Sequence, residues 1–360
     1  MSPQPAAYVS TPVIALNGKT DTGAMSDLMA LAVEETTAGM AWCEATFGNW
    51  GIRNSATDYL YLSGDPIDFG TALTVSFAAD GEDRPVFAGK VSALQADYPA
   101  DRPARLRVLA EDRLQDLRLT RRTRTFEDST TADIADRLAG DHGLTSDVKL
   151  DGPSRKVTAQ LNQSDLAFLR GLARSDDGEV WLDGTTLWVR RRPDRDAATV
   201  RLAYGADLLS FSVRADLAHQ VSEVAVTGWS VADKAAIHET ADSSDLAAEL
   251  GPGQRGGSSL LASAFGDRSE RIVRSAPLAA DDARALAKAA YLARARRFVC
   301  GTGTTAGNPA LRVGVRVGLT GLGDAFDGDY TVCRVRHEYD LAQGYRTEFD
   351  VERAGLGAVR

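Results

Sequence analysis

The sequence contains little cysteine. Its three cysteines, Cys43, Cys300 and Cys333, lie far apart among 360 residues, and no two of them form a C-x-x-C pair. This number and spacing argue against a disulfide framework and against a structural zinc site. We therefore expect each cysteine to be a small buried apolar side chain.

Long apolar runs are also missing. No run in the sequence approaches the roughly 18 residues that a membrane-spanning helix requires. Residues 1–5 lack the basic start and the apolar core that mark a secretory signal. We therefore expect no membrane-spanning segment, and we expect the protein to fold in the cytoplasm.

Motifs for hydrolysis are absent. The sequence has no H-E-x-x-H and no G-x-S-x-G, so it shows no machinery for metal-dependent or nucleophilic hydrolysis. No histidine has a second histidine at helical spacing for a metal. We expect His337, which lies in a strand beside Glu338, to be a surface or interface residue. Paired carboxylates for glycoside cleavage stay open, because 50 acidic residues always offer some pair.

Two segments match ligand-binding motifs only in part. Residues 301–307 have G-x-G-x-x-x-G spacing, but they lack the Gly-Lys-Ser/Thr ending of a phosphate loop and lead into a strand. We expect a flexible turn there. Asp324, Asp327 and Asp329 do not follow the order of an EF-hand, so we expect an aspartate-rich turn. The sequence thus predicts a protein that is not an enzyme and that holds no cofactor and no metal.

The charge balance is acidic. A formal net charge of −9 gives no support for stable binding of duplex DNA, and it would suit a channel wall that repels anionic cargo. Few aromatic residues interleave the basic runs, as base stacking would require. These runs either protect a solvated strand edge or form ion pairs with a neighbouring subunit or partner protein. They consist of Arg118, Arg121, Arg122, Arg124 and residues 190–192.

The sequence does contain regular β-strand patterns. At 360 residues the chain is long enough for two or three domains. Short alternating strands separated by turn residues recur up to residue 111, as in an all-β barrel or sandwich. The expected strands cover residues 13–16, 31–35, 41–47, 73–77, 86–91 and 106–109. We interpret residues 1–115 as a first antiparallel β-barrel domain.

The period changes over residues 116–200, which we interpret as a small α/β domain. A capping-box-like start at Thr130 and Asp133 predicts a helix over about residues 131–142. The hydroxyl of Ser164 can cap a second helix.

A hairpin is expected at residues 180–189, with Asp183-Gly184 as its two-residue turn. In that register Trp181 and Trp188 lie diagonally on one face of the hairpin. This face must be covered by another domain or subunit, or stay partly exposed.

Residues 201–360 are expected to form a second β-barrel domain. Within them residues 241–259 are dominated by Ser, Gly, Asp and Pro, so we expect a flexible excursion over about 233–275. Acids at the start and arginines at the end predict a helix over about 281–298. The predicted class is therefore mainly β, with two antiparallel β-barrel domains flanking a small α/β domain.

Several motifs carry a resemblance to a known family. They are Leu119-Thr120-Arg121-Arg122, Gln163-Ser164-Asp165 with Phe168-Leu169-Arg170, Phe326-Asp327-Gly328-Asp329-Tyr330, His337-Glu338-Tyr339-Asp340 and Gly344-Tyr345-Arg346-Thr347. In this order they resemble the late control protein D family, the baseplate hub of contractile phage tails, which is similar to the hub part of type VI secretion VgrG spikes. The Gln-Ser-Asp-x-x-Phe-Leu-Arg run is the most specific piece, and the resemblance covers most of the chain.

The resemblance implies a structural role. It implies a homotrimer in which two barrels per chain give a six-fold-like ring that caps a tail tube and carries a spike. VgrG spikes continue into further domains that do not follow Arg360 here, so the spike is expected to be a separate chain. The implied partners are the tail tube protein, the spike protein and other baseplate components. The protein would be made in the bacterial cytoplasm and assembled into a phage tail or phage-like injection particle.

Aromatic anchors and arginines dominate such contacts. We therefore expect six residues at interfaces of the assembly, namely Trp181, Trp188, Arg121, Arg122, Arg124 and His337.

Two other classes of function stay open. A peptidoglycan-binding or cell-wall-degrading tail protein could hold glycan on the two tryptophans and would clear a cell-wall suspension. A nucleic-acid-binding factor could use the arginine run and would show salt-dependent retention on DNA.

Overall fold

The computed structural model describes residues 10–53, 56–61, 66–79, 81–195, 198–274 and 279–357. Residues 1–9 of the predicted first domain, residue 275 of the predicted excursion and residues 358–360 of the predicted second barrel lie outside these ranges. Within them the chain is mainly β with large antiparallel sheets, which confirms the predicted class. None of the described helices is both long and apolar enough to cross a membrane.

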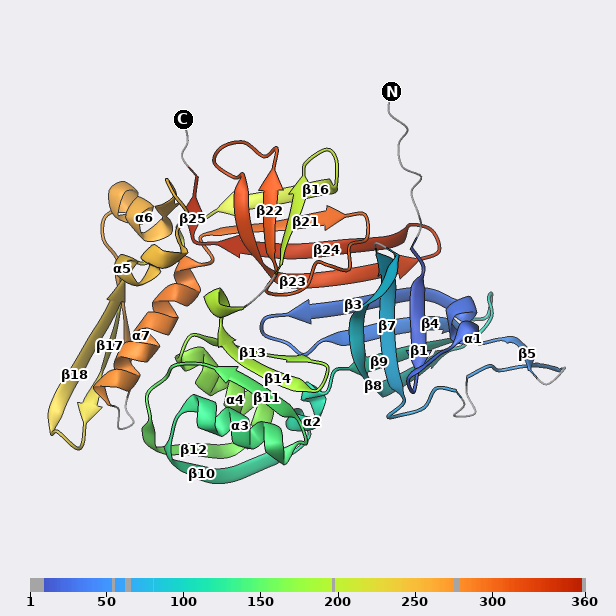
Figure 1. Ribbon diagram of the computed structural model, residues 1–360, viewed down its shortest axis with the longest axis horizontal. Helices are drawn as coiled ribbons and strands as arrows, with labels where there is room; N and C mark the ends of the chain where they lie inside the picture. The colour runs from blue at the N-terminus through green and yellow to red at the C-terminus, as the bar shows by residue number, and fades with distance from the viewer. Residues whose placement is uncertain are drawn as a thin grey trace.

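One large sheet dominates the fold (Figure 1). Among the described residues its main path runs in the order β16-β21-β24-β23-β3-β4-β9-β8-β7-β1-β2, and β22 joins β15 to β23. The N-terminal strands are β1 (Pro12–Leu16), β2 (Lys19–Thr20), β3 (Leu28–Thr36), β4 (Trp42–Gly48), β7 (Ala72–Ala79), β8 (Glu82–Asp97) and β9 (Arg105–Glu111), with helix α1 (Thr22–Asp27) and the separate hairpin β5 (Gly51–Arg53) and β6 (Ala56–Asp58) between them. The C-terminal strands are β15 (Thr199–Ala203), β16 (Leu208–Ala215), β21 (Val299–Thr305), β22 (Arg316–Thr320), β23 (Gly328–Asp340) and β24 (Gly344–Arg353). The six strands predicted before residue 111 are all present.

A strand pairing joins the two β-rich halves. β3 pairs antiparallel with β23, from Thr36 opposite Arg334 to Ala30 opposite Asp340. A hydrophobic cluster lies in each half. The main strand path is open in the described part of the chain, with ends at β16 and β2, and the branch through β22 gives a third edge at β15. The division into domains at residues 115 and 200 stays a prediction.

The middle of the chain forms a unit with its own core, below the large sheet in Figure 1. Its elements are α2 (Leu114–Arg118), β10 (Arg121–Ser129), α3 (Thr131–Asp141), β11 (Thr145–Lys149), β12 (Arg155–Ser164), α4 (Asp165–Ser175), β13 (Gly178–Asp183), β14 (Thr186–Arg191) and η1 (Arg192–Asp194). The sheet β11-β14-β13 packs on α3 and α4, and β10 pairs with β12. Both predicted helices are confirmed, because Thr130 and Asp133 form the capping box of α3 and Ser164 caps α4.

The Gln-Ser-Asp-x-x-Phe-Leu-Arg run holds this unit together. Asp165 is buried and accepts hydrogen bonds from Gln160 at 2.8 Å, while its other oxygen lies 2.9 Å from His142 Nε2. The phenylalanine and leucine of the run lie in the core. Arg170 donates to the carbonyl of Gly39 at 2.7 Å, which ties α4 to the first β-rich half. The motif therefore stabilises the middle unit and attaches it to the first β-rich half.

The β13–β14 hairpin turns one residue later than predicted. Asp183 is the last paired residue of β13, so the turn consists of Gly184 and Thr185. Gly184 has φ of 58°, a conformation that glycine adopts without strain. Trp181 consequently lies directly opposite Trp188, where the prediction had placed them diagonally.

Residues 241–259 fold against the rest of the chain, so the expected unpacked excursion was wrong. The elements here are β17 (Glu223–Ser230), β18 (Ala235–Asp242), α5 (Ser243–Leu246), η2 (Ala247–Glu249), β19 (Arg255–Gly256), α6 (Gly257–Phe265), β20 (Ser269–Val273), α7 (Ala280–Ala295) and β25 (Gly355–Leu356). The sheet β18-β17-β20 packs on α7, the helix predicted at 281–298. Leu246 and Leu261 are buried, and Asp245 pairs with Arg284 at 2.6 Å. A few buried leucines and an ion pair thus hold residues 241–259 in place, although this segment has few apolar side chains.

Residues 301–307 were expected to form a flexible turn, and this was wrong as well. Most of them belong to strand β21. A Cβ at Gly301 would lie 2.5 Å from the ring of Phe211, and one at Gly303 would lie 2.5 Å from the ring of Phe349. The glycines therefore make room for two aromatic side chains in the second core.

Candidate functional site

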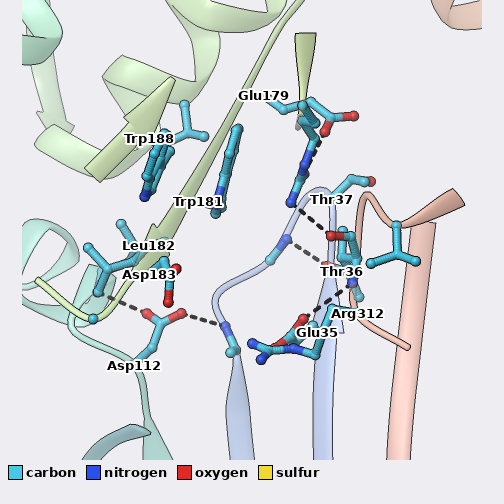
Figure 2. A pocket seen from close by; sticks show the side chains of 18 of the residues that line it. Glu35, Thr36, Thr37, Asp112, Glu179, Trp181, Leu182, Asp183, Trp188 and Arg312 are labelled. Atoms are coloured by element: carbon cyan, nitrogen blue, oxygen red, sulfur yellow. Dashed lines mark hydrogen bonds and ion pairs between the residues drawn. The ribbon is translucent and has the colours of Figure 1, made fainter. Parts of the chain in front are cut away.

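A cavity of about 750 Å³ lies between the middle unit and the two β-rich halves. Its walls come from the loop between β3 and β4, from β8, from the β13–β14 hairpin and from the segment before β22 (Figure 2). We call it the junction cleft. Because three parts of the chain line it, its shape depends on how they are held together.

The two predicted tryptophans form part of a stack on one wall. Their ring centroids are 6.0 Å apart and the rings are 8° from parallel. The guanidinium of Arg190 lies 4.4 Å from the centroid of Trp188, and that of Arg195 lies 3.9 Å from the centroid of Trp181. Arg190 pairs with Asp147 on β11, on the side of Trp188 that faces away from Trp181. Each indole therefore has the other indole and one guanidinium as neighbours, and both side chains stay partly exposed.

Glu179 fastens this wall to the second β-rich half. It pairs with Arg192 at 3.1 Å and with Arg195 at 2.8 Å. Arg192 also pairs with Glu352 on β24, and Arg195 donates to the carbonyl of Val313 at 2.8 Å. Burial opposes ionisation of Glu179, but the two guanidinium charges outweigh it and lower the pKa of its carboxyl.

The opposite wall is anchored by Asp112. Its carboxylate accepts hydrogen bonds from the backbone N–H of Ala41 at 2.8 Å and of Leu114 at 2.9 Å. Met40, at the tip of the β3–β4 loop, packs against the core of the middle unit. Burial raises the pKa of Asp112 to about 6, although both hydrogen bonds act in the opposite direction. The first β-rich half therefore inserts a loop into the middle unit.

Two further arginines join the middle unit to the α7 region. Arg296 pairs with Asp177 at 2.5 Å and with Glu249 at 2.6 Å. Burial disfavours the charge of Arg296, but its hydrogen bonds to these two carboxylates raise its pKa above the ordinary value. Arg155 reaches Asp282 on α7 at 2.8 Å. Together with Arg192, these ion pairs hold all three parts of the chain in one arrangement.

The predicted arginine run lies away from the junction cleft. Arg124 pairs with Asp165 at 2.9 Å and with Asp141 at 2.8 Å, and Arg122 lies 3.4 Å from Asp165. Both therefore serve contacts within the chain. Arg121 is exposed and donates only to a backbone carbonyl. It stays the candidate of this run for contact with a partner.

The expectation that His337 is a surface or interface residue was wrong. Its side chain is completely buried near the seam between β3 and β23, with Nδ1 2.8 Å from the Tyr345 hydroxyl and 3.1 Å from Thr347 Oγ1. Tyr345 in turn stacks on Phe77 of β7 at 3.6 Å between centroids. Burial, with the nearby charge of Arg312, lowers the pKa of His337 to about 3. The sequence offered no sign of this burial, because the neighbouring residues are charged.

Other residues of the cleft were missed from sequence. Glu179, Arg195 and Asp112 sit in segments without any motif, and their partners lie far away in the chain. The predicted tryptophan hairpin and the basic run at 190–192 pointed toward this region. Among the described residues no three His, Cys, Asp or Glu side chains are grouped so as to hold a metal ion.

The sequence of this chain matches a known family. A family model described as the Alg8 N-terminal domain matches residues 53–340. The chain belongs to this family. The matched residues include β6 to β9 of the first β-rich half, the middle unit with its hairpin, and the second β-rich half up to the end of β23. Membership of the late control protein D family stays a prediction. No curated protein matches the sequence significantly.

Several solved structures share the fold. The 43 kDa tail protein of prophage MuSo2 from Shewanella oneidensis is 18% identical, with a TM-score of 0.69 over 96% of this chain and 98% of that chain. A tail protein from Neisseria meningitidis is 16% identical, with a TM-score of 0.66 over 96% and 97%. The c3393 protein of Escherichia coli, a component of the type VI secretion system, is 11% identical, with a TM-score of 0.59 over 96% and 79%. At such identities the likeness shows a common fold.

Proposed function

We propose that this chain is a structural component of a contractile tail and, more narrowly, the baseplate hub. In this role it would be a homotrimeric symmetry adaptor that caps the tail tube and carries a separate spike protein. The observation that carries the proposal is the fold shared with two tail proteins over 96% of this chain and nearly the whole of each relative. A fold common to whole tail proteins supports a role in the tail.

The internal contacts suit a part that transmits force. Arg192, Arg296 and Arg155 each join the middle unit to another part of the chain through a carboxylate. Guanidinium–carboxylate pairs fix orientation as well as distance, because the donors are held in a planar fork. Their side chains are largely buried, so solvent screens them little. Such a body would keep its shape under load.

The large sheet suits assembly into a ring. The two ends of its main path, β16 and β2, are unlike each other, so a contact between them on neighbouring copies would be head-to-tail. Head-to-tail contacts give rings when the rotation closes. Two β-rich halves per chain would give a trimer six similar positions around its axis. Arg121 remains a candidate for subunit contact, and the tube protein, the spike and other baseplate components are the proposed partners.

Electron microscopy of the purified chain tests the proposal. We expect class averages with three-fold symmetry and a central pore, and a mass of three chains by light scattering. The same measurement with the tail tube protein added should show the ring docked on a tube end. Particles of one chain under both conditions would contradict the hub proposal.

No specific observation favours the two alternatives. Glycan binding through Trp181 and Trp188 would need an open indole face, and each indole already has the other indole and a guanidinium as neighbours. Pull-down with peptidoglycan and clearing of a cell-wall suspension still provide a direct test, and activity in either would favour a wall-acting protein. Retention on DNA at low salt would favour a nucleic-acid-binding factor, against the net charge of −9.

A further inference from the structure

The junction cleft runs along the edge of a strand. Residues 179–184, which are consecutive, all line it. Successive residues of a strand point to opposite faces, and the side chains of Val180 and Leu182 pack toward the core of the middle unit. A cavity that touches both kinds of residue must lie beside the strand rather than over one of its faces.

That edge of the sheet is free. β13 is the end strand of the sheet β11-β14-β13 and pairs with β14 on one side only. In an antiparallel pair, alternate residues turn their backbone N–H and C=O groups away from the partner strand. In the described ranges, no backbone hydrogen bond outside the ladder reaches residues 179–183. The cleft therefore holds a row of unused donors and acceptors at the spacing of a β-ladder.

One carboxylate beside this edge forms no ion pair. Glu179 is paired with Arg195, and Glu35 with Arg312. Asp183 lines the cleft, is exposed, and has no ion pair within the described part of the chain, although its charge helps Glu35 to raise the pKa of Arg312 against the effect of burial. Figure 2 shows its carboxylate facing the space between the hairpin and the β3–β4 loop. A ligand lying in the cleft would therefore gain most from a positive charge near Asp183.

We propose that the junction cleft binds an extended peptide segment of a partner protein, which adds as a fourth strand along β13 and places a basic side chain against Asp183. Backbone hydrogen bonds would supply affinity, and the indole edges of the stack would select the side chains. At about 3.3 Å per residue, a segment of about six residues would follow β13 from end to end. This site is additional to the hub role, because subunit contacts at the sheet ends do not fill it.

A peptide fits the cleft better than a sugar or a small anion. Sugars stack on open aromatic faces, whereas each indole here already has the other ring and a guanidinium close to it. Of the cations that line the cleft, the arginines each have a carboxylate partner, so in the described part of the chain only Lys149 would be left to pair with an anion. A free strand edge is complementary to another strand.

The test begins with a bead-bound library of random heptapeptides, selected on the full chain and counter-selected on Asp183→Lys. We expect enrichment of sequences with a basic residue and alternating apolar residues. The best peptide is then synthesised with a fluorescein label, and its dissociation constant is measured by fluorescence polarisation. Asp183→Lys should weaken binding at least tenfold. Glu127→Lys, the same charge change on an exposed residue of β10, should alter it less than twofold.

The mode of binding is tested by methylating alternate backbone nitrogens of that peptide. An added strand turns every second N–H toward β13, so one methylated analogue should lose at least tenfold in affinity while the analogue of opposite phase stays within threefold. Equal binding of the two analogues would overturn the proposal. It would also be overturned by a library without enriched sequences, or by unchanged binding to a folded Asp183→Lys variant. None of these results depends on whether the chain forms a trimer.

Discussion

The buried imidazole of His337 should make the seam between the two β-rich halves sensitive to acid. Burial and the charge of Arg312 lower its pKa to about 3, whereas a histidine in an unfolded chain titrates near 6.5. Below pH 6.5 the unfolded chain therefore binds a proton that the folded protein does not bind. The free energy of unfolding must fall as the pH falls, from about pH 6.5 down to about pH 3.

The magnitude follows from the two pKa values. One unit of difference corresponds to about 1.4 kcal/mol, and the loss begins at the pKa of the unfolded state. From pH 7 to pH 5 the proton uptake of this one group lowers the free energy of unfolding by about 2 kcal/mol. The folded-state pKa of about 3 contributes almost nothing over this interval, since it lies two units below its lower limit.

The assay compares the wild type with His337→Gln, whose amide can accept a hydrogen bond from Tyr345 but cannot take up a proton at these pH values. Urea unfolding gives the free energy of unfolding of each protein at pH 7, 6 and 5. Near-ultraviolet circular dichroism reports the packing of the aromatic side chains at the seam. We expect the difference between the proteins to change by about 2 kcal/mol in favour of the variant at pH 5. Other acids are common to both proteins, so their titration cancels. If the free energies of unfolding of the two proteins changed with pH in parallel, the predicted role of His337 would be refuted.

Three further substitutions test other parts of the structure. Arg296→Ala leaves two largely buried carboxylates without their cation, and we expect a loss of about 3 kcal/mol in urea unfolding, which Arg296→Lys recovers only in part. Asp112→Asn sets an amide NH₂ against a backbone N–H and should cost about 1–3 kcal/mol in thermal unfolding. Because burial raises the pKa of Asp112 to about 6, the wild type itself loses stability as pH rises toward 6, so this penalty should be larger at pH 4 than at pH 7. Gly303→Ala should cost about 1–3 kcal/mol through contact with a phenylalanine ring, and Phe349→Leu in the same chain should restore part of it; strict additivity in melting curves would contradict that contact.

Local patterns were sufficient for elements whose determinants lie within a few residues. The capping box at Thr130 and Asp133 and the cap at Ser164 mark the starts of α3 and α4, because both act over three residues. Six of the strands up to residue 111 follow from alternation alone, whereas the short strands β2, β5 and β6 were not predicted. The position of the hairpin turn did not, since a shift of one residue at Gly184 keeps every side chain of the hairpin on its face and leaves the sequence pattern unchanged.

The candidate site was out of reach of such patterns. Arg296 meets Asp177 across 119 residues, and Arg192 meets Glu352 across 160. The sequence contains many arginines and many carboxylates, and it does not show which of them pair. The two tryptophans could be assigned to a common face, but the guanidinium groups that cover them come from ordinary charged positions. Tertiary structure decides which charges become buried pairs.

The same pairs decide what a ligand in the junction cleft could do. Glu179 forms one wall of the cleft and is held by Arg192 and Arg195, which also contact the second β-rich half. A peptide added along β13 would therefore meet a wall that cannot rotate without breaking two buried ion pairs. Breaking a buried pair typically costs about 3–5 kcal/mol, more than a short peptide could supply in excess of its own ordering cost. The bound segment would then act as a fixed tether, which attaches a partner to the body without changing the body's shape.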